Sequence, residues 1–516
     1  MGPRRRRGRD VSGPVMATLL GAAARRLRGG AERAAPTADP DAALAADLRA
    51  AIGAERVRAD AAARYLVSRD ASIYSEGTAG PLCLPTSTEQ VAACVRIAAD
   101  HGRAVVPRGA GTGLAGGAAP LGRPVVLSLT RMNQLLSVDL DNGVAWVQPG
   151  MVNLELSRRL APYGMHYAPD PSSQQACTIG GNVATNSGGP HCLAYGVTSA
   201  HVVALEVVLS DASVVTLGDL TAEPAGYDLR GAFVGSEGMC GITTAAAVRL
   251  TPDPAAVRTL LIAYDDVSSC AATVGAIIAD GIVPAAIEML DQRCVGAIED
   301  FARAGYPRDA AAVLLVEVDG PPSGVAVAAD RVAEIAAANG AVSVRAAADD
   351  EERARLWKGR KSAFGAVANI LPDYYLHDTV VPRSRLVEVL EQVYEIADRY
   401  DLTALNVFHA GDGNLHPILA FDARLPGTME RVHAAGREII EASLAVGGAL
   451  SGEHGIGMEK RDYMERMFSD ADLDQQSRLR AAFDPHCRMN PGKVLPSAHS
   501  CADIGSLRAA DGKIWG

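Results

Sequence analysis

The chain has 516 residues and a formal net charge of −11 at pH 7. A single hydrophobic core rarely grows to this length, so we expect several domains. The acidic balance argues against nucleic acid as the main partner. The sequence has no uncharged apolar run of about 18 residues, so no segment is expected to span a bilayer as a helix.

The nine cysteines are scattered along the chain. Their number is odd and no C-x-x-C pair occurs, so we expect no disulfide framework and a reducing compartment. The closely spaced cysteine runs that hold iron–sulfur clusters are also absent from the sequence. If the chain carries out redox chemistry, its electrons must leave by another route.

Residues 1–75 are interpreted as a basic tail followed by a helical lead-in. Four arginines at 4–7 precede an apolar stretch at 15–24, an arrangement loosely similar to an export signal. Arginines from Arg25 onward interrupt that signal. The alternatives are a disordered basic tail, or a natural chain start at Met16.

Residues 76–252 are expected to form an α+β domain. A helix is predicted over 86–101, where Ser87 is a cap-like residue and Gly102 ends the helical pattern. Short strands are predicted at 104–106, 125–129, 144–148 and 204–209. The prolines at 252 and 254 mark the predicted domain border.

Residues 253–480 show a different sequence pattern from that of the preceding domain. Strand-like runs at 260–264, 285–290, 313–318 and 342–345 alternate with alanine-rich helical stretches. This rhythm predicts an antiparallel sheet with helices on one face. A helix is expected over 383–400 and a further strand over 404–409.

The segment that follows the 104–106 strand contains a formal G-x-G-x-x-G at Gly111, Gly113 and Gly116. In a dinucleotide-binding Rossmann unit, a helix should begin there. Pro120 and Pro124 make that helix improbable, so we discount NAD. The remaining interpretation is a loop whose backbone N–H groups approach a diphosphate closely.

Two more segments of this kind follow, at 170–190 and 235–242. Each alone is a weak signal, because glycine turns are common. Three of them in one domain, rich in small hydroxyl and amide side chains, predict a backbone-lined groove for a long polar ligand. A dinucleotide fits this description.

The segments PRGAGTGLAGG, DPSSQ with TIGGNVATNSGG, and GSEGMCGI resemble the flavin domain of the vanillyl-alcohol oxidase / p-cresol methylhydroxylase superfamily. Over about residues 60–505 the chain is similar to the FAD-linked subunits of bacterial glycolate oxidase (glycolate dehydrogenase), with D-lactate and D-2-hydroxyglutarate dehydrogenases as relatives. The resemblance implies an α+β fold with a two-part FAD-binding domain, a cap domain covered by helices, and a return to the flavin by the tail at 481–516.

The resemblance also implies which residues bind FAD. They are Pro107, Arg108, Gly109, Ala110, Gly111, Thr112, Gly113, Pro171, Ser172, Gly180, Gly181, Asn182, Asn186, Gly188, Gly189, Glu237, Gly241, Ile242 and Asn490. Relatives with covalent FAD often carry a histidine in the first glycine loop. This chain has none there, so we expect non-covalent FAD.

Two histidines flank the turn Gly-Asp-Gly-Asn at 411–414. A four-residue hairpin loop would place His409 directly opposite His416, with Cβ atoms about 5 Å apart. The two imidazoles could then share one metal ion. The alternative is two histidines that only cap their own hairpin.

Glu453 and His454 lie between glycines in the segment 451–457. A set of His409, His416 and Glu453 leaves coordination positions open, as catalytic divalent sites do. In the resembled family these three positions match the metal ligands, for which we consider zinc or manganese, and His454 matches the general base.

A substrate carboxylate needs a cationic partner. Arg360 matches the carboxylate-binding arginine of the family, and a bidentate guanidinium suits that task. The alternative is an exposed basic helix start. Tyr374, Tyr375 and His377 follow and are expected to line the pocket.

These observations predict an FAD-dependent enzyme that oxidises glycolate, or a close D-2-hydroxy acid, to the 2-oxo acid by hydride transfer to the flavin. The alternatives are D-lactate or D-2-hydroxyglutarate oxidation, and a non-catalytic flavin subunit. Expected partners are a second flavin subunit and an iron–sulfur subunit that accepts electrons. The expected location is cytoplasmic, with membrane contact only through those partners.

Overall fold

A computed structural model describes residues 39–72, 76–220 and 226–496. The chain divides into two units, Met1–Ala43 and Leu44–Gly516. The arginine-rich start, the signal-like stretch and Met16 lie outside the described residues. In the expected helical lead-in, helices α2 (Ala42–Ile52) and α3 (Ala61–Leu66) are present, with the short strand β1 (Val57–Arg58) between them.

The first glycine loop leaves a four-stranded sheet. In this sheet, β2 (Leu82–Cys83), β4 (Val125–Ser128) and β3 (Val105–Arg108) run parallel, and β1 lies at its edge. The predicted helix is α4 (Thr88–Asp100), and Ser87 caps it by accepting from the Gln90 amide. No helix occurs in the described segment between β3 and β4, so the exclusion of a Rossmann unit is confirmed.

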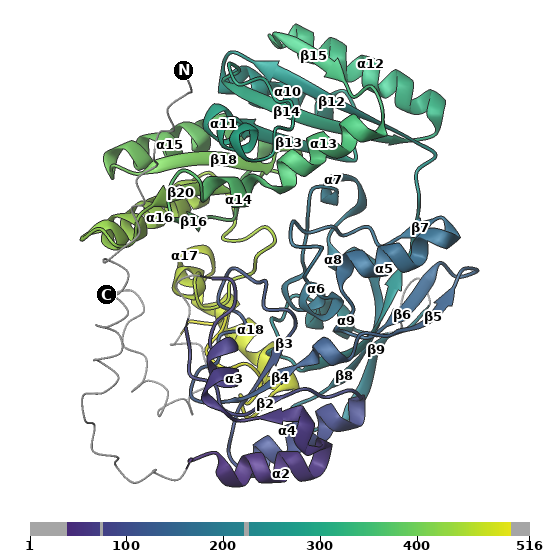
Figure 1. Ribbon diagram of the computed structural model, residues 1–516, viewed down its shortest axis with the longest axis vertical. Helices are drawn as coiled ribbons and strands as arrows, with labels where there is room; N and C mark the ends of the chain where they lie inside the picture. Colours follow the sequence, from purple (N-terminus) through teal and green to yellow (C-terminus); the bar gives the residue numbers. More distant parts are fainter. Residues whose placement is uncertain (1–38, 73–75, 221–225, 497–516) are drawn as a thin grey trace, which may run out of the picture. The chain divides into compact units, whose positions relative to one another are not determined.

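A five-stranded antiparallel sheet supports the other glycine segments (Figure 1). Its order is β5 (Leu135–Asp139), β6 (Val144–Val147), β10 (Ile242–Arg249), β8 (Val202–Val208) and β9 (Val214–Gly218). Helices α5 (Asn153–Leu160), α6 (Ile179–Thr185), α7 (Cys192–Tyr195), α8 (Thr198–His201) and α9 (Leu229–Phe233) accompany it. The second glycine segment thus contains a short helix, α6, that the sequence did not predict.

The larger sheet is antiparallel and belongs to residues 256–421. Its order is β15 (Ser343–Ala346), β12 (Ala256–Tyr264), β14 (Ala312–Gly320), β13 (Ala286–Asp291), β18 (Thr403–His409), β19 (Asn414–Leu415) and β17 (Thr379–Val380). Two further strands, β16 (Asp373–Leu376) and β20 (Pro417–Phe421), pair with each other, and β20 also pairs with β18.

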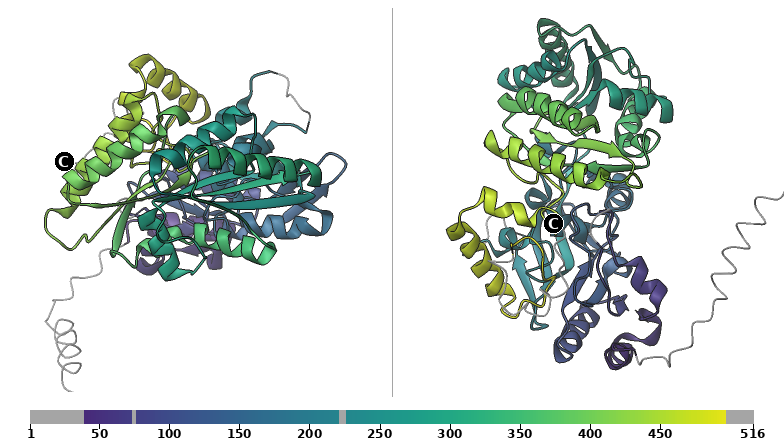
Figure 2. Two further views of the ribbon diagram at one scale, coloured as in Figure 1. Left: turned by 90° about the horizontal axis from the view of Figure 1, so that it is seen from above. Right: turned by 90° about the vertical axis from the view of Figure 1, so that its left-hand side faces the viewer.

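Helices cover both faces of this sheet, as the left view of Figure 2 shows, so the prediction of helices on one face is wrong. Leu260 and Ile262 of β12 pack with one helix group, whereas Leu261 and Ala263 pack with the other. A strand that is buried on both faces has an unbroken apolar sequence. Such a sequence does not show that helices cover both faces of the sheet. The first group is α10 (Val267–Ala279), α12 (Pro322–Ala338), α15 (Leu386–Arg399) and α16 (Thr428–Ala445); the second is α11 (Gln292–Phe301), α13 (Asp350–Lys361) and α14 (Ala363–Val367).

The described part of the tail returns to the first sheet. After α17 (Met464–Met467) and α18 (Asp470–Phe483), Met489 forms a parallel bridge with Val105 of β3. The Val105 amide donates to the Arg488 carbonyl at 2.8 Å, and the Asn490 amide donates to the Val105 carbonyl at 2.8 Å. This pairing places residue 490 beside the first glycine loop.

Among the described helices, none combines the length and the hydropathy needed to cross a membrane. Seven described cysteines carry free thiols, and Cys487 is disulfide-bonded. A single disulfide-bonded cysteine does not make a disulfide framework, but it means that the described cysteines are not all reduced.

Candidate active site

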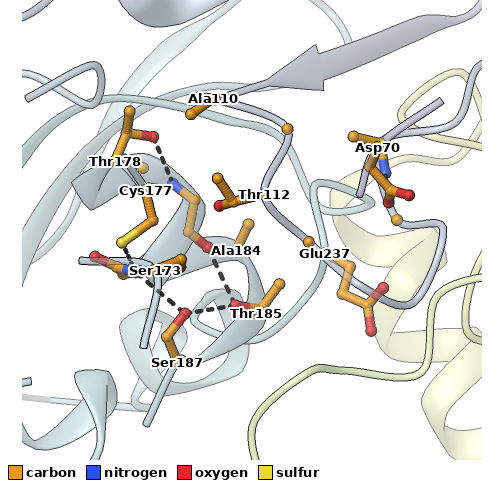
Figure 3. A pocket seen from close by; sticks show the side chains of 18 of the residues that line it. Asp70, Ala110, Thr112, Ser173, Cys177, Thr178, Ala184, Thr185, Ser187 and Glu237 are labelled. Atoms are coloured by element: carbon orange, nitrogen blue, oxygen red, sulfur yellow. Dashed lines mark hydrogen bonds between the residues drawn. The ribbon is translucent and has the colours of Figure 1, made fainter. Parts of the chain in front are cut away.

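A cavity of about 550 Å³ is lined by all three glycine-rich segments and by residues of the larger sheet region. In Figure 3, Cys177, Thr178 and Ser187 lie on one side of it and Asp70 lies opposite. The predicted FAD contacts that line the cavity are Pro107, Arg108, Gly109, Ala110, Gly111, Thr112, Gly113, Pro171, Ser172, Gly180, Gly181, Asn182, Glu237, Gly241 and Ile242. Segments far apart in sequence therefore meet around one cavity.

Four predicted contacts do not line the cavity. Asn186 accepts from the Ser199 amide at 2.8 Å and ends helix α6 in a left-handed conformation. Gly188 and Gly189 lie behind the lining. A Cβ on Gly188 would lie 3.0 Å from Glu453 Oε2. These residues shape the loops and make no cavity contact of their own.

Asn490 is the fourth. Its amide group donates to the Gly117 carbonyl at 2.8 Å and to the Glu237 carbonyl at 2.7 Å. Its Oδ1 is buried without a hydrogen-bond partner, so the expected contact with FAD stays a prediction. The buried amide is engaged by the backbone of two glycine segments, and it ties them together.

The cavity lining fits a dinucleotide. Nη1 of Arg108 is buried without a hydrogen-bond partner, as expected of a cation that awaits an anionic group. Gly111 has φ +75°, and a Cβ there would lie 2.1 Å from Arg108 Nη2. The glycine thus lets the guanidinium fold over the loop that lines the cavity.

A cluster of His409, His416 and Glu453 lies at the cap side of the cavity, where Glu453 is part of the lining. Glu453 Oε1 lies 3.1 Å from Nε2 of His416 and 3.5 Å from Nε2 of His409. One ligand atom from each residue lies within 4.8 Å of the other two. The three predicted ligands are therefore brought together.

The predicted hairpin register is wrong. His409 pairs with Asn414, and Asn406 pairs with Pro417, so His409 and His416 are not directly opposite. The shift moves each partner by two positions, and a shift of two keeps side chains on the same face. The imidazole centroids consequently lie 5.2 Å apart despite the changed register.

Hydrogen bonds behind the cluster orient both rings. His409 Nδ1 lies 2.7 Å from Glu288 Oε1, and His416 Nδ1 lies 3.3 Å from the carbonyl of His377. With Nδ1 engaged by an acceptor, each imidazole directs Nε2 toward Glu453. His409 Nε2 and Glu453 Oε2 are both buried without a hydrogen-bond partner. The donor set fits a divalent cation with open positions.

Electrostatics in the cluster favour a positive charge. Although burial raises the pKa of Glu453, His409 and His416 hold it well below its ordinary value. Burial lowers the pKa of His409, but Glu288 and Glu453 raise it well above its ordinary value. A proton or a metal ion can supply the favoured charge, and metal binding would displace the proton.

The segment 451–457 carries both Glu453 and His454, and Asp378 holds its first half. Oδ2 of Asp378 accepts from Ser451 Oγ at 2.6 Å, and its carboxylate accepts from the next three backbone amides at 3.0–3.3 Å. Asp378, His416 and His454 form a second group close enough for a metal ion. Because the loop already engages Asp378, we favour the group that contains Glu453.

Glu237 holds the second half of the same segment. Its carboxylate accepts from the amide of Ile456 at 2.7 Å and from that of Gly457 at 2.9 Å. Lys460 Nζ donates to the Asp378 carbonyl at 2.6 Å and to Oδ2 at 3.2 Å. Two buried carboxylates thus fix the loop between the third glycine segment and the larger sheet.

His454 lines the cavity between these anchors. Its Nδ1 lies 4.0 Å from Asp378 Oδ2, and its Nε2 lies 3.7 Å from Glu453 Oε1. Its ring stacks on His416 with centroids 5.1 Å apart. Burial lowers the pKa of His454 to about 4 despite the nearby Asp378 carboxylate. A neutral imidazole is the form that accepts a proton.

Arg360 is bonded to Glu288 and also keeps Nη1 buried without a hydrogen-bond partner, so its substrate-binding role stays a prediction. Arg360 is 1% exposed and does not line the cavity, and its Nε donates to Glu288 Oε2 at 2.6 Å. A buried guanidinium needs a carboxylate partner, and Glu288 provides it from inside the protein. The alternative of an exposed helix start is wrong, since Arg360 faces the sheet.

Other residues were missed or placed differently. Tyr374 lines the cavity as expected, but the Tyr375 hydroxyl donates to Glu459 at 2.7 Å and His377 is buried beside Tyr375. Glu288 and Asp378 were missed. The single acid inside the otherwise apolar run 286–290, AIEML, was the available signal for Glu288.

Family models match two parts of the chain. The model described as "FAD binding domain" matches residues 81–218, and "FAD linked oxidases, C-terminal domain" matches residues 253–494. Glycolate oxidase subunit GlcD of Escherichia coli strain K12 is 46% identical over 431 residues, which cover 84% of this chain and 86% of that protein. GlcD of Bacillus subtilis strain 168 is 42% identical over 84% of this chain and 93% of that protein.

D-lactate dehydrogenase of Anaerostipes hadrus is 33% identical over 82% of this chain and 91% of that protein. Among solved structures, p-cresol methylhydroxylase with substrate bound shares the fold, with a TM-score of 0.74, 17% identity, and 88% and 96% of the two chains covered. The 4-ethylphenol oxidase of Gulosibacter chungangensis gives a TM-score of 0.73 at 19% identity, with 90% and 98% covered. The chain belongs to the FAD-linked oxidases, with a flavin domain and a cap domain of the vanillyl-alcohol oxidase / p-cresol methylhydroxylase type.

Proposed function

We propose that this protein oxidises glycolate, or a close D-2-hydroxy acid such as D-lactate, to the corresponding 2-oxo acid with FAD. One observation carries the proposal. A metal-ligand set and a neutral histidine adjoin the cavity that the three glycine segments line. A flavin subunit without catalysis would have no need for this set. The names of the relatives in the same family support the choice of substrate class.

In this proposal His454 is the general base. It accepts the proton of the substrate hydroxyl at Nε2, the ring nitrogen nearer Glu453. The Asp378 and Glu237 carboxylates hold the loop, so the ring does not have to be ordered when substrate arrives. The glycine segments hold the cofactor, and Arg108 supplies positive charge to its diphosphate.

FAD, bound non-covalently, supplies the acceptor for the hydride that leaves the substrate carbon. The proposed ligands His409, His416 and Glu453 would hold a divalent ion, zinc or manganese, which lowers the pKa of a bound hydroxyl. The absence of a histidine in the segment Ala110-Gly111-Thr112 supports non-covalent binding.

We further propose that the electrons pass to a separate acceptor, such as an iron–sulfur subunit working with a second flavin subunit. The chain's own cysteine spacing supports this, because it lacks iron–sulfur runs. We retain the division into a lead-in at 1–75, a flavin domain at 76–252, a cap at 253–480 and a tail at 481–516. A cytoplasmic location is proposed from the seven free thiols.

Anaerobic stopped-flow spectroscopy tests the function. The purified holoenzyme is mixed with glycolate, D-lactate, L-lactate and D-2-hydroxyglutarate, and the loss of oxidised-flavin absorbance is followed. The expected result is fast reduction by glycolate or D-lactate and slow reduction by L-lactate. In air the reduced protein should consume oxygen slowly. Failure of all four acids to reduce the flavin would overturn the proposal.

A further inference from the structure

Glu459 is a buried carboxyl group that the proposed mechanism does not use. The residue is 5% exposed, and in the described part of the chain its side chain has one hydrogen-bond donor, the hydroxyl of Tyr375 at 2.7 Å. The ammonium of Lys460, the next residue, bonds Asp378 instead. A buried carboxylate with one neutral donor is poorly stabilised in its charged form.

Other buried carboxylates of the cap are held differently. Asp378 accepts from three backbone amides and from Lys460, which keeps its pKa below the ordinary value despite burial. A guanidinium and an imidazole do the same for the pKa of Glu288. Glu459 lacks contacts of this kind, so its carboxyl group is placed to gain or lose a proton near neutral pH.

The electrostatic surroundings agree with this geometry. Burial raises the pKa of Glu459 to about 7, and the nearby carboxylates of Asp378 and Asp70 add to the rise. The ammonium of Lys460 and the hydrogen bond from Tyr375 oppose it. The carboxyl group is therefore protonated below about pH 7 and charged above it.

Strand β16 separates Glu459 from the interior of the cavity. Successive side chains of a strand point to opposite sides. Tyr374 and Leu376 line the cavity, whereas Tyr375 between them points to Glu459. The ring of His377 packs against Tyr375 with centroids 4.3 Å apart, and burial lowers its pKa to about 3, so it adds no charge near neutral pH.

Glu459 nevertheless lies close to the cavity that fits FAD. The amides of Met458 and Glu459 donate to the carbonyl of Ala115 at 2.9 and 3.2 Å, and Ala115 lines the cavity. Asp70, which Figure 3 shows at the cavity, is near enough to raise the pKa of Glu459. A charge that arrives in the cavity therefore acts on Glu459 through the protein interior, where it is screened less than in water.

We propose that Glu459 takes up a proton when the flavin is reduced, and that this proton balances negative charge that the flavin gains. The inference rests on the proposed function. In that reaction the C–H and O–H bonds of the hydroxy acid break and a C=O bond forms. The hydride carries both electrons to the flavin, and His454 accepts the hydroxyl proton. The proton then leaves His454, and Glu459 changes from a carboxylate to a carboxylic acid.

The test counts the protons that accompany reduction. The midpoint potential of the FAD-loaded protein is measured anaerobically with redox dyes, without substrate, from about pH 6 to about pH 9, and its slope against pH gives the protons taken up. The wild type is compared with Glu459→Gln. Glu465→Gln, an exposed change in α17 that does not line the cavity, is the matched control. Thermal melting and FAD content confirm that the variants are intact.

Between about pH 7 and pH 8 the wild type should take up as much as about one proton more per flavin than Glu459→Gln, because the charge of the reduced flavin raises the Glu459 pKa further. At about pH 6 the two should coincide, since the carboxyl group is already protonated. Glu465→Gln should follow the wild type. Equal proton numbers at every pH in an intact Glu459→Gln variant would overturn the inference.

Tyr375→Phe gives a second readout that does not require Glu459→Gln to fold. Loss of the hydrogen bond to the carboxylate should move the pH range of extra proton uptake upward by about 0.5 to 1 pH unit. An unchanged range would overturn the inference. A wild type that no 2-hydroxy acid reduces would instead overturn the proposed function, because the dye titration needs no substrate.

Discussion

Glu288 accepts a hydrogen bond from Nδ1 of His409 at 2.7 Å, and the two residues are direct cross-strand partners in the larger sheet. Glu288 is fully buried and His409 is 3% exposed. The bond fixes the ring so that Nε2 faces Glu453. Arg360 bonds the other oxygen of the Glu288 carboxylate. A chain of contacts thus runs from helix α13 to the proposed metal site.

Replacing Glu288 by glutamine should weaken metal binding. An amide holds the Nδ1–H of His409 less strongly than a carboxylate does, and loss of such a partner typically costs about 10- to 100-fold in metal affinity. The measurement is the Kd for zinc and for manganese, by competition with a chromophoric chelator. Glu334→Gln, an exposed change in the same cap, is the control. Equal affinities in an intact Glu288→Gln variant would remove this role.

Removal of the metal should lower turnover. A chelator followed by gel filtration is expected to reduce the rate of flavin reduction by substrate while FAD stays bound. Added zinc or manganese should restore the rate, because ligand atoms of His409, His416 and Glu453 lie close together and His409 Nε2 and Glu453 Oε2 have no hydrogen-bond partner. Indifference to both the chelator and the ions would exclude a catalytic metal.

His191 links the second glycine segment to the cap. Its Nδ1 bonds Asp170 at 2.9 Å and its Nε2 lies 3.4 Å from Glu317. Burial lowers the pKa of His191, but Asp170 and Glu317 outweigh burial and raise the pKa to about 10. Because the folded pKa exceeds the ordinary value of 6.5, the stabilisation is complete below about pH 6.5 and is lost as the pH rises through about 10.

His191→Gln should therefore lower the melting temperature by several degrees at pH 6, and the gap to the wild type should narrow as the pH approaches 10. Differential scanning fluorimetry across this range measures the gap. His166→Gln, which alters a surface pair with Asp253, is the control and should change little. A gap that stays constant with pH would contradict a charged His191.

The sequence pointed to the residues of the candidate site more completely than to the buried residues that hold them in place. Motifs identified the glycine loops and the residues His409, His416, Glu453 and His454, because side chains that bind ligands lie in short segments with characteristic glycines. The hairpin register was wrong, yet both histidines kept the same face because the shift was even. Asp378 and Glu288 were missed, since a buried carboxylate gains its meaning only from partners distant in sequence.

Arg360 and the cap helices show the same limit. From sequence, an arginine beside two lysines gives no sign of which one turns inward. In the structure Arg360 donates to Glu288, whereas Lys361 lines the cavity. Likewise, the apolar run 260–264 of strand β12 predicts burial but does not show how many helix layers provide it.

The most direct test of the account is the rate constant of flavin reduction by substrate in His454→Gln, measured anaerobically against the wild type. If His454 accepts the hydroxyl proton, the rate should fall by about 10²- to 10⁴-fold while FAD content and oxalate binding stay near those of the wild type. A variant that reduces its flavin at the wild-type rate would contradict the assignment of the base and, with it, the proposed site.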